Sequence, residues 1–128
     1  MSLADLFASL LGVRVLVVED HDDSREFLRH VLRQAGAHVI TASGARAALP
    51  FVSDVDIVVT DYAMPGEDGC WLLRQVETGP HRVPVIVVTG FGDNADVRRA
   101  SFARVLSKPT DPWRLCADIR EVLEQRHC

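Results

Sequence analysis

Short runs composed almost entirely of valine, leucine and isoleucine recur along this chain, separated by stretches with helix-like apolar spacing. They occupy residues 15–18, 57–60, 85–88 and 105–106, and a further short strand is expected over 38–41. Runs this apolar and this rich in β-branched residues are typical of strands buried on both faces of a parallel sheet. The sequence therefore predicts an α/β protein built from five βα units around a parallel sheet.

Polar residues follow these runs, and the carboxyl ends of strands in such a sheet form the ligand crevice. The residues concerned are Glu19, Asp20, Asp61, Thr89 and Lys108. A single acidic residue at a strand end is commonly no more than a solvated loop charge. Three carboxylates in one crevice repel one another, so they need a cation or carry raised pKa values. Oxygen ligands of this kind suit Mg²⁺, and Lys108 would supply a permanent countercharge.

Size and composition narrow the class of protein. The chain has 128 residues, 48% of them hydrophobic, and a net charge of −4, which fits one globular domain. The apolar runs are too short for a transmembrane helix, and the first residues lack the basic region of a signal peptide. The three cysteines (Cys70, Cys116 and Cys128) have no metal-like spacing, which indicates reduced thiols in a cytoplasmic protein. Without a basic block, we expect no nucleic-acid binding.

Helices are predicted between the strands from apolar spacing and from capping residues. Their expected ranges are 24–35, 44–53, 69–78 and 94–102, with a last helix that begins at Pro112. Asp68 and Asp111 are the expected N-caps, and Pro50 is expected to interrupt the second helix. Leucines at helical spacing over 2–11 precede Gly12. We interpret residues 1–12 as a leader or linker remnant in front of a domain that spans 13–128.

Four motifs give the chain a family resemblance over roughly residues 13–126. They are the acidic pair Glu19-Asp20, the segment Val-Val-Thr-Asp-Tyr-Ala-Met-Pro-Gly-Glu-Asp-Gly around Asp61, Val-Val-Thr-Gly around Thr89, and Lys108-Pro109. In this order, each at a predicted strand end, they resemble the receiver domains of bacterial response regulators. The resemblance implies a doubly wound five-stranded sheet of flavodoxin-like order 2-1-3-4-5 with helices on both faces. It also implies a cis Lys108-Pro109 bond.

The resemblance also assigns roles to residues of this sequence. It implies that Asp61 is the phosphoacceptor, and that Glu19, Asp20, Asp61 and the backbone carbonyl of Ala63 hold Mg²⁺. Thr89 and Lys108 would bind phosphoryl oxygens. The phosphodonor would be a histidine kinase or a phosphotransfer protein. The chain would then be a cytoplasmic switch of a two-component system or phosphorelay and not an enzyme, either a single-domain regulator or the receiver of a hybrid histidine kinase.

Some positions depart from the family pattern. Val105 stands where the family usually carries Tyr or Phe, whose ring swings inward on activation; a valine cannot make this movement, so we expect a different output. The stretch from 94 to 105 is also about one helical turn shorter than usual. Ala63 and Phe91 lie two residues after Asp61 and Thr89, and neither side chain can orient a water by hydrogen bonding. We therefore expect a long-lived phosphorylated state.

Two other functions fit the sequence less well. A Mg²⁺-dependent phosphohydrolase with an aspartyl-phosphate intermediate would, like haloacid dehalogenases, need a general acid two residues after the nucleophile, where this chain has Ala63. A flavodoxin-like flavin carrier would need Ser, Thr and Gly in place of Glu19 and Asp20. His21, beside the acidic pair, is expected to be exposed to solvent and not to be a metal ligand.

Overall fold

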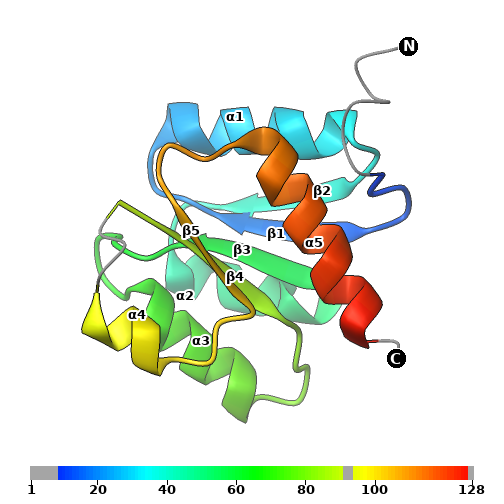
Figure 1. Cartoon of the computed structure of the whole chain (residues 1–128). Coiled ribbons are helices and arrows are strands. Elements are labelled where there is room, and N and C mark those ends of the chain that lie inside the picture. Colours follow the sequence, from blue (N-terminus) through cyan, green and yellow to red (C-terminus); the bar gives the residue numbers. More distant parts are fainter. Residues whose placement is uncertain (1–8, 91–93, 127–128) are drawn as a thin grey trace.

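The computed structural model describes residues 9–90 and 94–126, which form a five-stranded parallel sheet of order β2-β1-β3-β4-β5 flanked by helices (Figure 1). The elements are β1 (Arg14–Val18), α1 (Asp22–Gln34), β2 (His38–Ala42), α2 (Ala45–Ala48), the 3₁₀ helix η2 (Leu49–Asp54), β3 (Ile57–Asp61), α3 (Gly69–Thr78), β4 (Val85–Thr89), α4 (Ala95–Arg99), β5 (Arg104–Ser107) and α5 (Pro112–Arg126). Every strand pair is parallel. The predicted fold class and strand order are confirmed.

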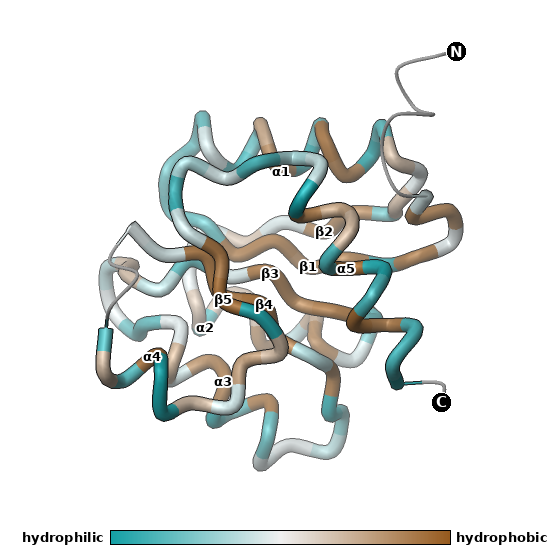
Figure 2. The backbone as a smooth tube through the Cα atoms, viewed as in Figure 1, coloured by the Kyte–Doolittle hydropathy of each residue, from teal (hydrophilic) through white to brown (hydrophobic). Residues whose placement is uncertain are grey.

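The core has two halves, one on each face of the sheet. Successive residues of a strand point to opposite faces. Val15 and Val17 therefore pack in one half with α1 and α5, whereas Leu16 and Val18 pack in the other with α2 and α3. The apolar strands run through the middle of the molecule in Figure 2. Because both faces are covered, the strands need the nearly continuous apolar runs from which the sheet was predicted.

The register of the sheet brings the carboxyl ends of four strands together. Thr60 of β3 lies opposite Val18 of β1, and the next residue, Asp61, lies opposite Val88 of β4. Thr89 in turn lies opposite Ser107 of β5. The residues that follow β1 and β5 therefore emerge beside Asp61 and Thr89, on the edge where the sequence predicted a site.

Helix ends were predicted best where a capping residue marks them. The helix α3 spans the predicted residues, and Asp68 Oδ1 accepts a hydrogen bond of 2.8 Å from the backbone N–H of Trp71. At α5, Asp111 Oδ1 accepts one of 2.9 Å from Trp113 N–H.

The bond between Lys108 and Pro109 is cis, as the resemblance implied. The second predicted helix is indeed broken: α2 is one turn long and gives way to η2, which has Pro50 in its first turn.

Apart from the broken second helix, two helix boundaries differ from the prediction by two residues or more. The helix α1 begins at Asp22 and not at 24, because Asp22 and Asp23 occupy its first turn, where negative charge interacts favourably with the helix dipole. The helix α4 ends at Arg99 and not at 102, because the backbone of Ala100 is extended.

The chain before β1 lies only partly within the described residues. Residues 1–8 fall outside them, so the helical spacing of the leucines is tested only over 9–11, which are not helical. The domain boundary at residue 12 stays a prediction. Leu10 is fully buried in the core half formed by α1 and α5, and its N–H donates to the carbonyl of Ala35 at 2.8 Å. Gly36 has a φ of +104° and lies against Leu11, so a side chain there would be strained.

Two remaining sequence expectations concern thiols and membranes. Cys70 and Cys116 are free and buried, and burial raises the pKa of the Cys116 thiol to about 11. Cys128 lies outside the described residues. Over 9–90 and 94–126, none of the helices combines the length and apolar content needed to span a bilayer.

Candidate functional site

Lys108 joins three parts of the carboxyl edge of the sheet. Its Nζ lies 2.9 Å from Asp61 Oδ2, at the end of β3, and 3.7 Å from Glu19 Oε2, directly after β1. Its backbone N–H donates to the carbonyl of Thr89 at 3.0 Å. Asp61 is only 5% exposed, so this ion pair is shielded from solvent on the Asp61 side. The structure thus brings together the carboxylates and the amine that the sequence predicted to converge.

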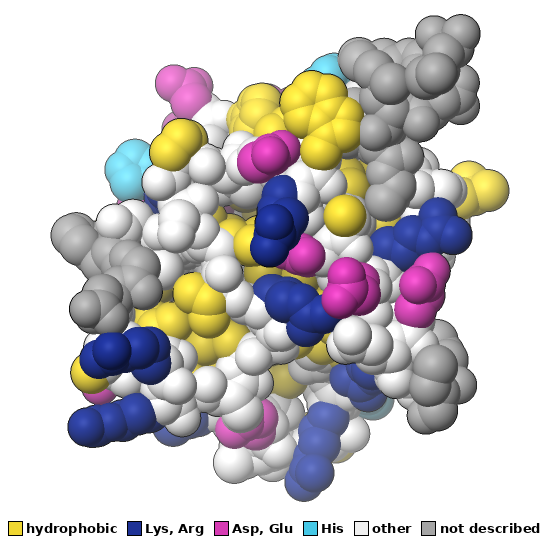
Figure 3. All heavy atoms as spheres, in the orientation of Figure 1, with side chains coloured by type: hydrophobic (Ala, Val, Ile, Leu, Met, Phe, Trp, Pro, Cys, Tyr) yellow, Lys and Arg dark blue, Asp and Glu magenta, His cyan; other side chains and the backbone are white. Residues whose placement is uncertain are grey.

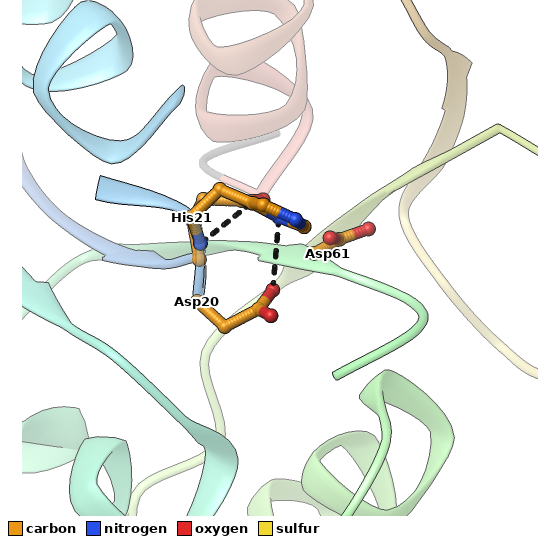
Figure 4. A group of neighbouring side chains, drawn as sticks. Asp20, His21 and Asp61 are labelled. Atoms are coloured by element: carbon orange, nitrogen blue, oxygen red, sulfur yellow. Dashed lines mark hydrogen bonds and ion pairs between the residues drawn. The ribbon is translucent and has the colours of Figure 1, made fainter. Parts of the chain in front are cut away.

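Glu19, Asp20, His21 and Asp61 form a compact cluster. One ligand atom from each of them lies within 4.8 Å of one from every other member. Figure 4 shows Asp20, His21 and Asp61 converging from the end of β1 and the end of β3. Oxygen ligands from three carboxylates in so small a volume match what a hard divalent cation requires.

Asp20 gives a second reason to expect a cation in this cluster. Its Oδ1 is buried and accepts no hydrogen bond from the described residues, although His21 Nδ1 lies 3.4 Å away. A buried carboxylate oxygen without a partner costs free energy, because it has lost its contact with water. A bound cation would remove that cost. The residues present therefore fit the Mg²⁺ site that the family resemblance implied.

The pKa shifts of the charged residues in the crevice also favour a bound cation. Burial, and then repulsion from Asp61, raise the pKa of Glu19, although hydrogen bonds from His21 and attraction to Lys108 oppose the rise. For Lys108, burial lowers the pKa, but the hydrogen bond and the attraction to Asp61 and Glu19 outweigh it, so the pKa is raised. Lys108 therefore stays protonated at neutral pH. The three carboxylates still outnumber this one ammonium group, which favours a cation.

Thr89 and Ala63 lie where the sequence placed them. Thr89 is the buried last residue of β4, next to the Lys108 backbone. Ala63 is exposed in the loop between β3 and α3, two residues beyond Asp61. Their roles as phosphoryl and metal ligands stay predictions. Phe91, whose side chain was predicted unable to orient a water, lies outside the described residues.

The contact of His21 with the acidic cluster was not predicted from the sequence. Its side chain is 72% exposed, as expected, yet its Nδ1 lies 3.1 Å from Glu19 Oε1. The ring therefore contacts a carboxylate of the cluster, a contact that the sequence did not predict. The available signal was its place directly after the acidic pair, in the turn that leads into α1.

Arg25 was missed altogether. Its Nη1 donates to the backbone carbonyl of Glu19 at 2.9 Å, and its Nη2 pairs with Asp22. It thereby fixes the loop that carries the acidic pair. A basic residue in the first turn of a helix opposes the helix dipole, so its presence there signals a specific partner.

A crevice of about 380 Å³ opens beside the cluster. Asp61 and Lys108 line it, together with the apolar side chains of Phe27 and Leu28 of α1 and of Pro109. Phe27 is half exposed. The crevice therefore offers an approach to Asp61 between α1 and the loop before α5.

On the side of the site away from this crevice lie α4 and β5. Val105 is 45% exposed on β5, and the last turn of α4 carries Arg98 and Arg99. Figure 3 shows apolar and basic side chains together over this part of the surface. No aromatic ring occupies position 105, so the inward swing associated with that position has no counterpart at this residue.

Comparison with known proteins gives consistent results. A family model of the response regulator receiver domain matches residues 15–120. An uncharacterized 14.6 kDa protein of Leptolyngbya boryana is 35% identical over 127 residues, which cover 94% of this chain and 93% of that protein. The C4-dicarboxylate transport transcriptional regulatory protein DctD of Pseudomonas aeruginosa is 36% identical over 119 residues, which cover 88% of this chain but only 26% of DctD.

Solved structures agree with these matches. A response regulator receiver domain protein from Clostridium thermocellum has a TM-score of 0.82 at 25% identity, covering 90% of this chain and 97% of that one. The receiver domain of the hybrid histidine kinase CckA has a TM-score of 0.73 at 28% identity, covering 86% and 98%. The chain thus spans nearly all of some relatives and about a quarter of DctD.

Proposed function

This chain belongs to the response regulator receiver domain family, and from that premise we propose that it is switched by Mg²⁺-dependent phosphorylation of Asp61. Receiver domains are signalling phosphoacceptors of response regulators and of hybrid histidine kinases. One observation carries the assignment to Asp61. Its buried carboxylate lies 2.9 Å from Lys108 Nζ and within the acidic cluster, so it meets both a fixed positive charge and the candidate cation site.

The residues around Asp61 supply what phosphoryl transfer requires. A carboxylate oxygen of Asp61 forms the new P–O bond while the P–N bond of a donor phosphohistidine breaks, and the electron pair of that bond returns to the imidazole nitrogen. The Lys108 ammonium and the Thr89 hydroxyl would then donate to phosphoryl oxygens. Such transfer depends mainly on positioning and on stabilising charge at the equatorial oxygens, and little covalent chemistry is asked of the protein.

Glu19, Asp20, Asp61 and the carbonyl of Ala63 would hold the Mg²⁺ ion. When bound, the ion would offset the negative charge that the phosphoryl group brings to an already acidic crevice. Arg25 contributes indirectly, because its hydrogen bond to the Glu19 carbonyl fixes the loop that carries two of these ligands.

The proposal extends to the setting of the protein. The phosphodonor would be a histidine kinase or a phosphotransfer protein, approaching Asp61 along the crevice between α1 and Pro109. The domain would span residues 13–128, act in the cytoplasm, and serve as a switch without turnover of a substrate. The phosphohydrolase alternative gains no support, since Ala63 has no proton to give at the position of its general acid.

Phosphorylation by a small donor tests the assignment of Asp61. Incubation with acetyl phosphate and Mg²⁺ should raise the intact mass by one phosphoryl group, and chelation with EDTA should prevent the gain. Asp61→Asn should abolish it. Asp54→Asn is the matched control, because Asp54 is an exposed aspartate at the end of η2, before β3 begins. Retention of the mass gain in Asp61→Asn would overturn the proposal.

A further inference from the structure

We propose that His21 is an additional ligand of the divalent-cation site, so that this site binds borderline transition-metal ions such as Ni²⁺ and Co²⁺ more tightly than its carboxylates alone would. This inference rests on the proposed function, since it concerns the same cation site. It assigns a ligand role to His21, which the sequence alone placed outside the site, and through that role a metal preference to the site.

The distances within the cluster suit a shared ion. His21 Nδ1 lies 3.1 Å from Glu19 Oε1 and 3.4 Å from Asp20 Oδ1. Two atoms that bind one ion at about 2.1 Å are about 3 Å apart when they are adjacent ligands. The His21 nitrogen therefore already lies at the separation from two carboxylate oxygens that neighbouring ligands have.

The backbone fixes the base of the His21 side chain. His21 is the N-cap residue of α1, and its carbonyl accepts a hydrogen bond of 2.9 Å from Arg25 N–H. Its own N–H donates to Glu19 Oε1 at 3.2 Å. The base of the imidazole is therefore held beside the two carboxylates. Because the ring is mostly exposed, it can join the site from the solvent side without burial of a polar group.

Asp20 again gives independent support. Its buried Oδ1 accepts no hydrogen bond from the described residues. Among the described residues, the one positively chargeable group within ion-pair distance of this atom is the His21 ring, at 3.4 Å. One ion between the two groups would satisfy the carboxylate oxygen and the ring nitrogen together.

Ligand chemistry then predicts the metal preference. Imidazole nitrogen suits Co²⁺, Ni²⁺, Cu²⁺ and Zn²⁺, whereas Mg²⁺ prefers oxygen ligands and keeps several of its waters. Loss of the imidazole should therefore weaken binding of the first group and leave Mg²⁺ binding nearly unchanged. If the ring acted only as a hydrogen-bond partner of Glu19, its loss would affect both kinds of ion alike.

Calorimetric titration of the full chain with NiCl₂ and with MgCl₂ tests the inference. His21→Ala should weaken Ni²⁺ binding about tenfold or more and change Mg²⁺ binding less than about threefold. His30→Ala is the matched control, since His30 is an exposed histidine further along α1. Bound Co²⁺ gives a second readout: its visible absorption spectrum should change in His21→Ala and stay unchanged in His30→Ala. Thermal unfolding checks that each variant is folded.

The outcomes separate this inference from the proposed function. Equal losses for Ni²⁺ and Mg²⁺, or no loss for either, would overturn the role of His21. Phosphorylation of the wild-type chain with acetyl phosphate and Mg²⁺ tests the function independently, because it does not depend on Ni²⁺ or Co²⁺. A selective loss of Ni²⁺ binding in His21→Ala would support the ligand assignment even if Asp61 were not phosphorylated.

Discussion

At the scale of single residues, Lys108 is the residue that links the site most directly to the rest of the fold. Its ammonium contacts Asp61 and Glu19, while its backbone N–H holds the end of β4 through Thr89. A phosphoryl group on Asp61 would take the place of the carboxylate oxygen as its partner. Lys108 would then have to move, and the backbone on either side of it leads directly into β5 and α5.

Replacement of Lys108 by alanine should uncouple phosphorylation from the response of the fold. Asp61 and the acidic cluster remain, so we expect phosphorylation still to be detectable. The charge-assisted hydrogen bond to the loop before α5 is lost, however. Amide chemical shifts of β5 and α5, recorded with and without beryllofluoride, should change much less in Lys108→Ala than in the wild type.

The control for this prediction is Lys108→Arg. It keeps the positive charge but changes the geometry of the donor group, so it should retain part of the response. A full response in Lys108→Ala would show that the ammonium does not transmit the change.

We expect Ala63 to influence how readily water is held near the phosphorylated residue. It is exposed two residues beyond Asp61 and offers no hydrogen-bonding group. Ala63→Asn should therefore accelerate hydrolysis of phospho-Asp61, measured as the decay of the phosphorylated mass after the donor is removed. Ala63→Leu matches asparagine in shape and lacks its polar atoms, so it should not accelerate the decay. Equal or slower decay in Ala63→Asn would place control of water elsewhere.

At the scale of helices and strands, the elements with clear end signals were predictable. Asp68 and Gly79 bracket α3, and both limits were right. Asp22, Asp23 and Ser24 are all candidate caps for α1. The residue that precedes α1 is instead His21, whose side chain makes no capping hydrogen bond. The start of α1 could not be chosen from capping chemistry alone. At α4 no glycine follows Arg99, so the sequence contains no mark of where that helix ends.

The contact between α3 and β3 depends on a glycine. A Cβ on Gly69 would lie 2.8 Å from the backbone oxygen of Asp61 and 3.2 Å from Tyr62 Cα. Alanine within a helix is ordinarily more favourable than glycine by about 1 kcal/mol. Here the clash with backbone atoms dominates, so Gly69→Ala should lower the free energy of unfolding by about 1–3 kcal/mol, measured by urea denaturation.

Gly90 provides the comparison for this substitution. Among the described residues, no atom would lie within 4 Å of a Cβ there. Gly90→Ala should therefore change the free energy of unfolding by less than about 0.5 kcal/mol. If the two variants were equally stable, the close approach of α3 to the end of β3 would not constrain position 69.

At the scale of the whole molecule, the sheet and its polar edge were predictable because they follow from local patterns. Apolar runs indicate strands buried on both faces, and the residues after them must emerge at one edge. Distances were not predictable, since they depend on register and on side-chain direction. The approach of His21 to Glu19 and the hydrogen bond from Arg25 to the Glu19 carbonyl arise from a single turn before α1, which sequence spacing does not specify.

The parallel sheet also has a kinetic consequence. Each pair of neighbouring strands is joined only after an intervening crossover has been closed, so these contacts form late relative to local helical ones. Glu19, Asp61 and Lys108 follow or end three different strands, β1, β3 and β5, and meet only when all the strands between them are paired. A nascent chain that lacks β5 has no Lys108 beside Asp61. Because Lys108 would couple phosphorylation to the response of the fold, that response would require complete folding, and partly folded chains would not signal even if Asp61 were phosphorylated.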